Sequence, residues 1–450
     1  MENQCLLDGK SKSWRYKITV EPTLLLYTVG ATISQNLQLN LLLDKSCRVY
    51  NVEGGFCETE MNSEVTVSQI NTWKLFFSTI FVVFFTSLTG PIIDKNPKTI
   101  PFILMIPILG QLFNDIGNYF SVYFWSWHIW VNCVLDAVLV GFTGSTFGFT
   151  LVCLSYLSYT SSTQERTVRI GFLYFCLAFA LSLGYFCSGY VVQWLGYYYG
   201  FGLCWFLYVS AILIGMRTIE DVDISPEKQT EDVTIFQTIQ QNFTVLTKER
   251  ENSKQTVIIL CLFVFPLVLG YPVGELSVLY LFLRRRFAWD ATEYGVYMSF
   301  KMIVKSCGAL LCTEILKRRL RLHDATIGAI GCALQLTMSI FWLMIYYSWQ
   351  VYAVTIMGAF EIGIVAVLTS LASKCVKPHE YGRLSSLFGF THIITPVVYP
   401  LYNMVYESSI YTFPSSFFLI TISLTAPCVL IFCILRYFGE KMREKELLPE

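Results

Sequence analysis

Apolar residues occur in long stretches that are separated by short polar segments over almost the whole chain. A helix that crosses a bilayer needs about 20 predominantly apolar residues. Twelve stretches of the 450-residue chain meet this requirement, and they cover residues 18–43, 71–93, 99–120, 128–153, 170–192, 197–216, 255–283, 292–314, 324–346, 350–373, 384–405 and 414–436. The pattern therefore predicts an all-α membrane protein with twelve transmembrane helices.

The composition agrees with a chain that lives in a bilayer. Hydrophobic residues make up 54% of the sequence, and Asp, Glu, Lys and Arg together make up 14%, whereas a soluble domain carries about 25% charged residues. The formal net charge is zero, so no nucleic-acid partner is indicated. We find no metal-ligand cluster, nucleophile–base arrangement or phosphate-binding loop, so we expect no cofactor and no enzyme activity.

Lysine and arginine residues predict the orientation of the chain. With the N-terminus in the cytosol, the cytosolic segments hold 24 basic residues and the outer loops hold five. The remaining three, Lys74, Lys301 and Lys305, fall within the spans. Because cytosolic loops are enriched in Lys and Arg, we expect both termini to be cytosolic.

The longest inner loop divides the spans into six and six. The predicted organisation is a cytosolic N-tail (1–17), a six-helix half (18–216), a cytosolic linker (217–254), a second six-helix half (255–436) and a cytosolic C-tail (437–450). This layout resembles the major facilitator superfamily, whose halves rock about a site near the middle of the bilayer.

The loop after the second span carries a sequence that resembles the signature of that superfamily. It reads Gly90-Pro-Ile-Ile-Asp94-Lys-Asn-Pro-Lys98-Thr99, against G-x-x-x-D-x-x-G-R-[RK]. The Asp94 carboxylate can cap a neighbouring helix and hold a basic side chain. We expect Asp94, with Lys98 and Arg169 as basic residues, to form a latch that holds one conformation.

Further short motifs resemble solute carrier family 46, the proton-coupled folate transporter family, and in particular its insect members. They are Trp73-Lys74, Glu165-Arg-Thr-Val-Arg-Ile-Gly171, Ser182-Leu-Gly-Tyr185, Ser188-Gly-Tyr190, Leu195-Gly-Tyr197, Leu279-Tyr-Leu-Phe-Leu-Arg284, Phe287-Ala-Trp289, His323-Asp-Ala-Thr-Ile-Gly328, Ala372-Ser-Lys374 and Ser386-Leu-Phe-Gly389. The resemblance implies uptake of a polar or anionic organic solute that is folate-like, muropeptide-like or cyclic-dinucleotide-like. It also implies that a proton gradient drives the uptake.

Several positions depart from the family pattern. Family members usually carry acids at the positions of Tyr159 and Tyr174, and an arginine near Thr369. The functional histidine of the folate member corresponds to the stretch Leu269-Gly-Tyr271. Either the proton relay has moved in this chain, or the coupling has changed.

Five charged residues away from the span ends are candidates for a functional site, since such residues usually face a water-filled path. They are Asp136, Glu275, Lys301, Lys305 and Glu361. Lys301 and Lys305 are four residues apart, so they share one helix face. Similar depths allow two pairs, Glu275 with Lys301 and Glu361 with Lys305. These pairs either bind an anionic solute or serve as structural bridges between helices.

Other polar residues in the spans are less clearly assigned. Tyr271 lies beside Pro272, where an irregular backbone can contact solute or simply kink the helix. Asp136 has no evident charged partner in its half, and Asp115 lies near a span end, where we expect no role. His392 titrates near neutrality and can carry a proton, or it is a packing residue.

The loops and tails predict processing and location. Cys47 and Cys57 lie in the first outer loop, where a disulfide can persist, although two free thiols are the alternative. The N-tail contains Glu2-Asn-Gln-Cys-Leu-Leu7, which fits an endolysosomal sorting signal. We expect a monomer in the plasma membrane or the endolysosomal membrane. The alternative function is a transporter-like receptor or scaffold that binds a ligand without net transport.

Overall fold

The computed structural model describes residues 18–50, 60–162, 165–219, 235–248, 250, 253–289, 291–409 and 411–447. These ranges are helical and contain no strand, which confirms the predicted all-α class. The long helices are α1 (Glu21–Tyr50), α2 (Glu60–Lys95), α3 (Ile100–Tyr123), α5 (Ser145–Thr160), α6 (Arg166–Tyr190), α7 (Gly196–Thr218), α9 (Lys254–Phe287), α10 (Ala291–Leu310), α11 (Asp324–Leu343), α13 (Glu361–Lys374), α15 (Thr395–Ser409) and α16 (Phe417–Leu447). The shorter ones are α4 (Ile129–Leu135), α8 (Ile235–Thr247), α12 (Ser348–Met357) and α14 (Tyr381–Thr391).

Short 3-10 and π segments join some of these helices into single spans. The π segments are η2 (Asp136–Val140), η3 (Val191–Leu195) and η5 (Leu311–Arg319). The 3-10 segments are η1 (Pro97–Thr99), η6 (Gly358–Phe360), η7 (Pro378–Glu380), η8 (His392–Ile394) and η9 (Pro414–Ser416). Since π segments often occur at functional positions, the placement of Asp136 at the start of η2 is notable.

Twelve spans result when these pieces are assembled. They are α1, α2, α3, α4–η2–α5, α6, α7, α9, α10–η5, α11, α12–η6–α13, α14–η8–α15 and α16. In the described residues, ten stretches are long and apolar enough to cross a membrane. One of them, Arg166–Thr218, holds both α6 and α7, and α1 completes the set.

Several elements differ from the sequence-based prediction. Helix α1 continues to Tyr50, so Cys47 lies within this helix and not in the first outer loop. Helix α2 begins at Glu60, well ahead of residue 71, and the linker contains the helix α8, which the polarity of that segment concealed. Apolar residues recur in α8 at helical spacing, at Ile239, Phe243 and Leu246. That spacing favours an amphipathic helix.

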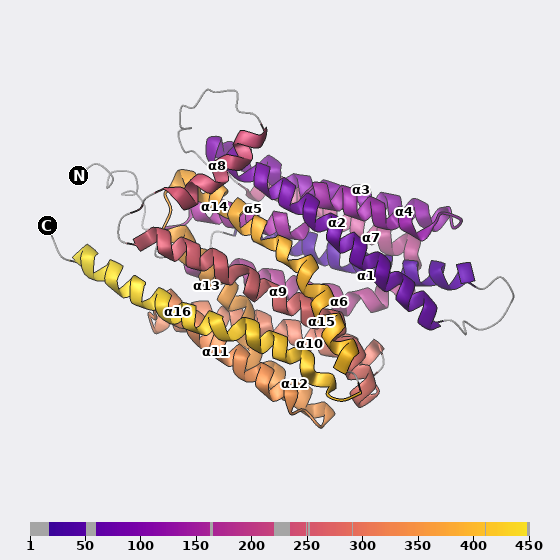
Figure 1. The fold of residues 1–450 in the computed structure, drawn as a ribbon. Helices are drawn as coiled ribbons and strands as arrows, with labels where there is room; N and C mark the ends of the chain where they lie inside the picture. The colour runs from indigo at the N-terminus through magenta and orange to yellow at the C-terminus, as the bar shows by residue number, and fades with distance from the viewer. Residues whose placement is uncertain are drawn as a thin grey trace.

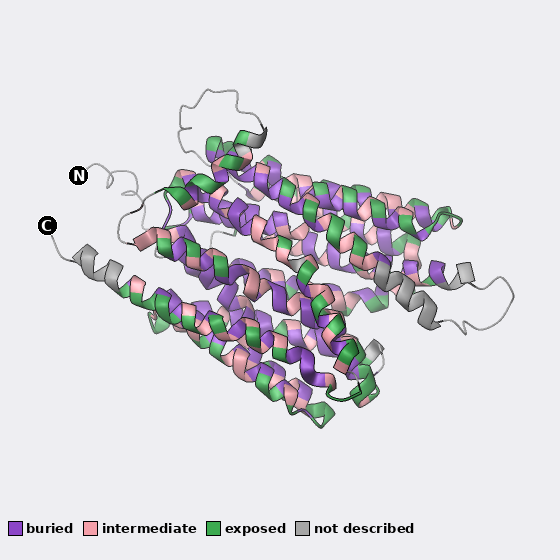
Figure 2. Cartoon of the chain, viewed as in Figure 1, coloured by how far each residue is buried: buried purple, intermediate pink, exposed green. Residues whose placement is uncertain are grey.

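Apolar side chains cover the outside of the bundle as well as its interior. Figure 2 shows buried residues along the helix faces that meet one another and exposed residues along the outer faces. Large exposed side chains include Phe102, Trp194, Met216 and Leu430, each more than 65% exposed. In water such a surface would be costly, so it indicates contact with lipid.

The two halves meet closely at the end of the bundle that carries α8, which we call the linker end (Figure 1). Helix α2 of the first half packs on α14 of the second at this end, and α6 packs on α10 along the length of the two helices. A Cβ atom on Gly90 would collide with the backbone of Gly382, and the reverse also holds. Only glycine permits this approach, so these two residues fix how tightly α2 and α14 pack.

Candidate functional site

Two ion pairs lie inside the second half, as the spacing and depth of their residues predict. Lys305 Nζ of α10 is 2.5 Å from Glu361 Oε1 of α13, and Lys301 Nζ is 3.9 Å from Glu275 Oε2 of α9. All four side chains are at most 8% exposed. A charge buried this deeply is costly unless it is paired. We call these four paired residues the cluster.

The local backbone explains why Lys305 meets Glu361. Glu361 is the first residue of α13 and follows the 3-10 segment η6. Gly308, one turn after Lys305 on α10, lies against the backbone of Ala359. This close packing of α10 on η6 brings the ammonium group within reach of the carboxylate.

Hydroxyl groups extend the cluster towards α15 and α16. Thr421 Oγ1 donates to Glu275 Oε1 at 2.9 Å, and it also lies 2.8 Å from the hydroxyl of Tyr402. The fully buried hydroxyl of Tyr271 has no hydrogen-bond partner within the described part of the chain. It lies near Glu275 and Glu361, so Tyr271 borders the cluster, and its contact with solute stays a prediction.

A second charged pair lies in the first half, and here the prediction was wrong. Asp136 of η2 has a charged partner, Lys74 of α2, at 3.4 Å. Asn114 Nδ2 of α3 donates to the other Asp136 oxygen at 3.0 Å, and Lys74 Nζ also donates to Gln38 of α1 at 3.4 Å. The Lys74 and Asp136 side chains are 21% and 13% exposed, so this pair is more open to solvent than the pairs of the second half.

Asp115 also lies differently from the prediction. It is completely buried among α1, α3 and α7, where Ser34, Gln111 and Tyr208 donate hydrogen bonds to it. Its position near the end of the predicted span 99–120 suggested easy exposure. However, α3 continues to Tyr123 and neighbouring helices cover it.

His392 contacts the other half of the protein. Its ring stacks on Phe147 of α5, with centroids 4.0 Å apart and planes at 16°. Whether it carries a proton stays a prediction.

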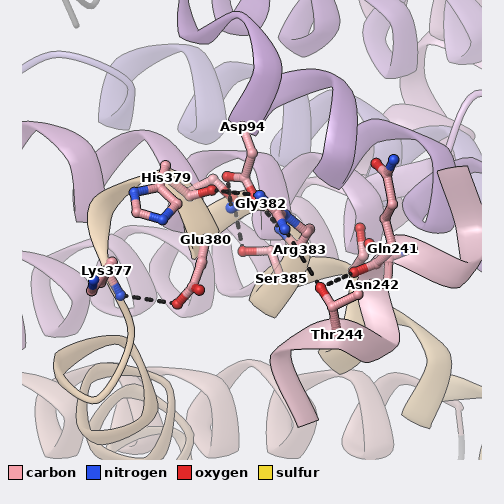
Figure 3. A network of polar contacts seen from close by, with 12 residues as sticks. Asp94, Gln241, Asn242, Thr244, Lys377, His379, Glu380, Gly382, Arg383 and Ser385 are labelled. Carbon is pink, nitrogen blue, oxygen red and sulfur yellow. Dashed lines mark hydrogen bonds and ion pairs between the residues drawn. The ribbon is translucent and has the colours of Figure 1, made fainter. Parts of the chain in front are cut away.

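The linker end is held by Asp94, as Figure 3 shows. The Asp94 carboxylate accepts hydrogen bonds from the backbone N–H groups of Gly382 and Arg383, at 2.6 and 2.9 Å, at the start of α14. It also accepts from Arg383 Nε at 3.1 Å and from the Tyr159 hydroxyl at 2.7 Å. Asp94 therefore caps a helix of the opposite half, where a negative charge is favoured by the helix dipole.

The basic partner of Asp94 was not the one expected. The contact is made by Arg383 rather than by Lys98 or Arg169. Arg169 instead donates to Thr160 and Ser161 of its own half. Because Arg383 is 289 positions from Asp94 in sequence, only the fold brings them together.

Other residues that join the halves at this end were missed in the sequence. Arg166 of α6 is buried and donates to the Ser373 carbonyl at 3.0 Å and to the Tyr381 hydroxyl at 2.7 Å. Asp324 pairs with Lys317 at 2.6 Å and with Lys374 at 2.5 Å. The Lys374 ammonium also donates to Thr167 of the first half at 2.6 Å.

Helix α8 adds contacts to both halves. Asn242 Nδ2 donates to the Ser87 carbonyl of α2 at 2.8 Å. Lys248 and Arg250, which follow α8, each lie 2.8 Å from a Glu380 oxygen beside α14. The linker thus holds the linker end together, and we call it the α8 clasp (residues 235–248 and 250).

Two of the positions that depart from the family pattern lie where the halves meet. Tyr174 is on α6 and Thr369 is on α13, and these helices of opposite halves pack on one another. Thr369 lines a small cavity, together with Ser158, Ser373, Tyr381 and Ser385. Neutral hydroxyl groups therefore take the place of charged ones here.

Some predictions lie outside the described residues. They are the N-tail 1–17 with its sorting motif, Cys57, and the side chain of Cys47. The Cys47–Cys57 disulfide stays a prediction.

Comparison with known proteins identifies the family. The family model described as Major Facilitator Superfamily matches residues 58–400. The chain belongs to the major facilitator superfamily. A Drosophila melanogaster protein named "Probable peptidoglycan muropeptide transporter SLC46" is 20% identical over 293 residues, which are 63% of this chain and 56% of that protein. A Gallus gallus protein named "Lysosomal proton-coupled steroid conjugate and bile acid symporter SLC46A3" is 24% identical over 331 residues, which are 71% of this chain and 70% of that protein.

These matches confirm the similarity to solute carrier family 46, although the chain spans only just over half of the Drosophila relative. Solved structures with the same fold include the human organic anion transporter MFSD10, with a TM-score of 0.68 and 13% identity over 92% of this chain and 97% of that one. A bacterial homologue of the iron transporter ferroportin, in an outward-facing state, has a TM-score of 0.66 and 11% identity over 93% of this chain and all of that one. At these identities the structures show the fold alone, which is that of superfamily transporters.

Proposed function

We propose that this protein is a secondary active transporter of a polar or anionic organic solute. It works by alternating access between an N-terminal half (18–216) and a C-terminal half (255–436), joined by the linker 217–254. The observation that carries the proposal is the cluster of two lysines and two glutamates buried within the second half. Superfamily transporters place their sites near the middle of the bilayer, at the interface between the halves.

The cluster gives a mechanism for handling an anion. Lys301 and Lys305 attract an anionic group, while Glu275 and Glu361 compete with it for the same ammonium groups. A proton that neutralises Glu361 releases Lys305 to the solute. Because ligands shift a conformational equilibrium only through differential affinity, breaking this pair is the event that couples binding to movement. Glu361 and His392 are the residues proposed for proton coupling.

Residues outside the four charges have supporting roles in this proposal. The Tyr271 hydroxyl, which has no hydrogen-bond partner among the described residues, can bond the solute or a water molecule. Asp136, paired with Lys74, supplies a charged contact from the first half. The protein acts as a monomer.

The conformation supports alternating access between the two sides. Asp94, Arg383 and the α8 clasp hold the linker end closed. If that end is cytosolic, as the distribution of Lys and Arg indicates, the described state is closed to the cytosol. The Asp94 latch must then open for solute release.

The substrate class follows from the chemistry of the cluster and the names of the relatives. Those names include muropeptides, steroid conjugates and bile acids, and a structural neighbour is named an organic anion transporter. We propose an organic anion among folates, muropeptides, cyclic dinucleotides and bile acid or steroid conjugates. The membrane is the plasma membrane or that of the endolysosomal system.

An uptake screen with these solutes at two pH values tests the proposal. Lys305→Met and Glu361→Gln should each abolish uptake at normal surface expression. Glu314→Gln is the matched control, because Glu314 forms an exposed pair with Arg318. Undiminished uptake by both cluster variants would refute the assignment of the site.

A further inference from the structure

Asp115 differs from most other buried acids among the described residues. Asp94, Glu275, Asp324, Glu361 and Glu380 each lie within 4 Å of a lysine or arginine group. Glu21, which also has no basic partner among the described residues, is the first residue of α1 and accepts a hydrogen bond from the Thr19 backbone N–H at 2.7 Å. Asp115 is 0% exposed, and among the described residues no basic group lies that close to it. A buried carboxylate without a counter-charge is costly, so something else must balance it.

The hydrogen bonds of Asp115 indicate which kind of cation can balance its negative charge. Ser34 Oγ of α1 donates to Oδ1 at 2.6 Å, Gln111 Nε2 of α3 donates to Oδ1 at 3.2 Å, and the Tyr208 hydroxyl of α7 donates to Oδ2 at 3.1 Å. These donors point hydrogen atoms at the carboxylate. Three of the about four lone-pair sites of the carboxylate are used by these donors, which leaves it few lone pairs for a metal cation.

A proton fits the same surroundings. Ser and Tyr hydroxyl groups donate or accept by rotating the O–H bond, whereas an ammonium or guanidinium group cannot accept. When Asp115 takes up a proton, its new O–H donates to Ser34 or Tyr208, and that hydroxyl turns away. Both charge states therefore keep hydrogen-bond partners without rebuilding the site.

We infer that Asp115 is a proton-binding site of the first half, separate from the ion pairs of the second half, and that it supplies a coupling proton. Proton binding by Asp115 does not depend on the proposed transport function, whereas its role in coupling rests on that function. It extends that function by relocating part of the proton relay, since the family positions Tyr159 and Tyr174 are neutral here.

The surroundings of Asp115 contain few other titratable groups. Tyr27 of α1, Asp136 of η2, and Cys204 and Tyr208 of α7 are close enough to interact with its charge. Lys74 is the partner of Asp136.

The partly exposed charges nearest to Asp115 among those named lie on the Asp136 side. Asn114, next to Asp115 in sequence, donates to Asp136, and the Asp136–Lys74 pair is partly exposed. The buried Asn114 Oδ1 has no partner among the described residues. This oxygen can accept a hydrogen bond from a water molecule.

The donors also explain how a proton would affect conformation. Ser34, Gln111 and Tyr208 belong to three different helices that Asp115 holds together. Hydrogen bonds to a charged acceptor are stronger than those to a neutral one. Protonation therefore loosens the contact of α1 and α7 with α3.

Infrared difference spectroscopy of the purified full chain tests proton binding without any solute. On acidification we expect a reversible carbonyl band of a buried carboxylic acid that is absent from Asp115→Asn and present in the matched control Asp44→Asn. Asp44 is exposed and accepts a bond from Tyr197. If Asp115→Asn does not fold, Ser34→Ala decides, because loss of one hydrogen bond should raise the frequency of the band. A spectrum that both variants leave unchanged would overturn the inference.

Transport distinguishes coupling from simple proton binding. With the solute that exchanges best in the uptake screen, Asp115→Asn should retain counterflow at equal pH. It should lose about tenfold in accumulation for a gradient of one pH unit, the factor supplied by one coupled proton. Normal accumulation by Asp115→Asn would contradict the coupling role. If no solute is transported, the proposed function fails, while the infrared result still decides proton binding.

Discussion

The Asp94 latch allows a prediction whose size follows from the structure. Replacing Asp94 by Asn removes the negative charge and one of the two oxygens that accept hydrogen bonds from Gly382, Arg383 and Tyr159. The Asn amide group must then face an N–H donor. We expect the state that is closed at the linker end to lose stability relative to the open state.

The magnitude comes from the bonds that Asn cannot make. Two of the four contacts are lost, and hydrogen bonds to a charged group contribute about 1.5–3 kcal/mol each. The Arg383 side chain is 22% exposed, so water replaces part of the loss. A net change of about 2 kcal/mol remains, which corresponds to about 30-fold in the equilibrium between closed and open states.

Hydrogen–deuterium exchange measures this shift in the unlabelled protein. The reporter is the peptide at the start of α6, around Arg166 and Thr167, because it packs on the opposite half without touching Asp94. Its exchange should become about 30-fold faster if opening of the linker end limits exchange. Asp44→Asn is the control and should leave the rate unchanged. An unchanged rate in a folded Asp94→Asn protein would refute the latch.

Three other perturbations test separate contacts. Gly382→Ala places a Cβ against the backbone of α2, so it should speed exchange at the same α6 peptide, and an unchanged rate would contradict the close packing. Lys305→Met and Glu361→Gln should each lower the free energy of unfolding by about 3–5 kcal/mol, whereas the double variant should recover most of that loss. Additive losses in a double-mutant cycle would show that the two residues do not interact. Glu380→Gln should release the α8 clasp and accelerate proteolysis of the linker, and an unchanged cleavage rate would exclude Glu380 as its anchor.

The sequence predicted those features that depend on local periodicity and depth. The four-residue spacing of Lys301 and Lys305 placed both on one face of α10, and similar depth paired Lys305 with Glu361. Long apolar stretches predicted the twelve spans, because burying backbone polar groups in lipid requires helices.

Features that depend on contacts between distant segments could not be predicted. No feature of the sequence links Arg383 to Asp94, because the helix cap forms only where α2 meets α14 in the folded protein. Asp136 was thought to lack a partner, because Lys74 belongs to another helix, α2. Asp115 was expected to have no role because it lies near a span end, and that position says nothing about the helices that cover it.

The central claim is that this chain moves a solute across a membrane rather than only binding it. The most direct test is concentrative uptake into sealed proteoliposomes under an imposed pH gradient, using a folate, a muropeptide, a cyclic dinucleotide and a bile acid conjugate. We predict that the internal concentration of one of them exceeds the external concentration and that Glu361→Gln abolishes this excess. Saturable binding whose internal concentration never exceeds the external one would contradict the claim and indicate a receptor.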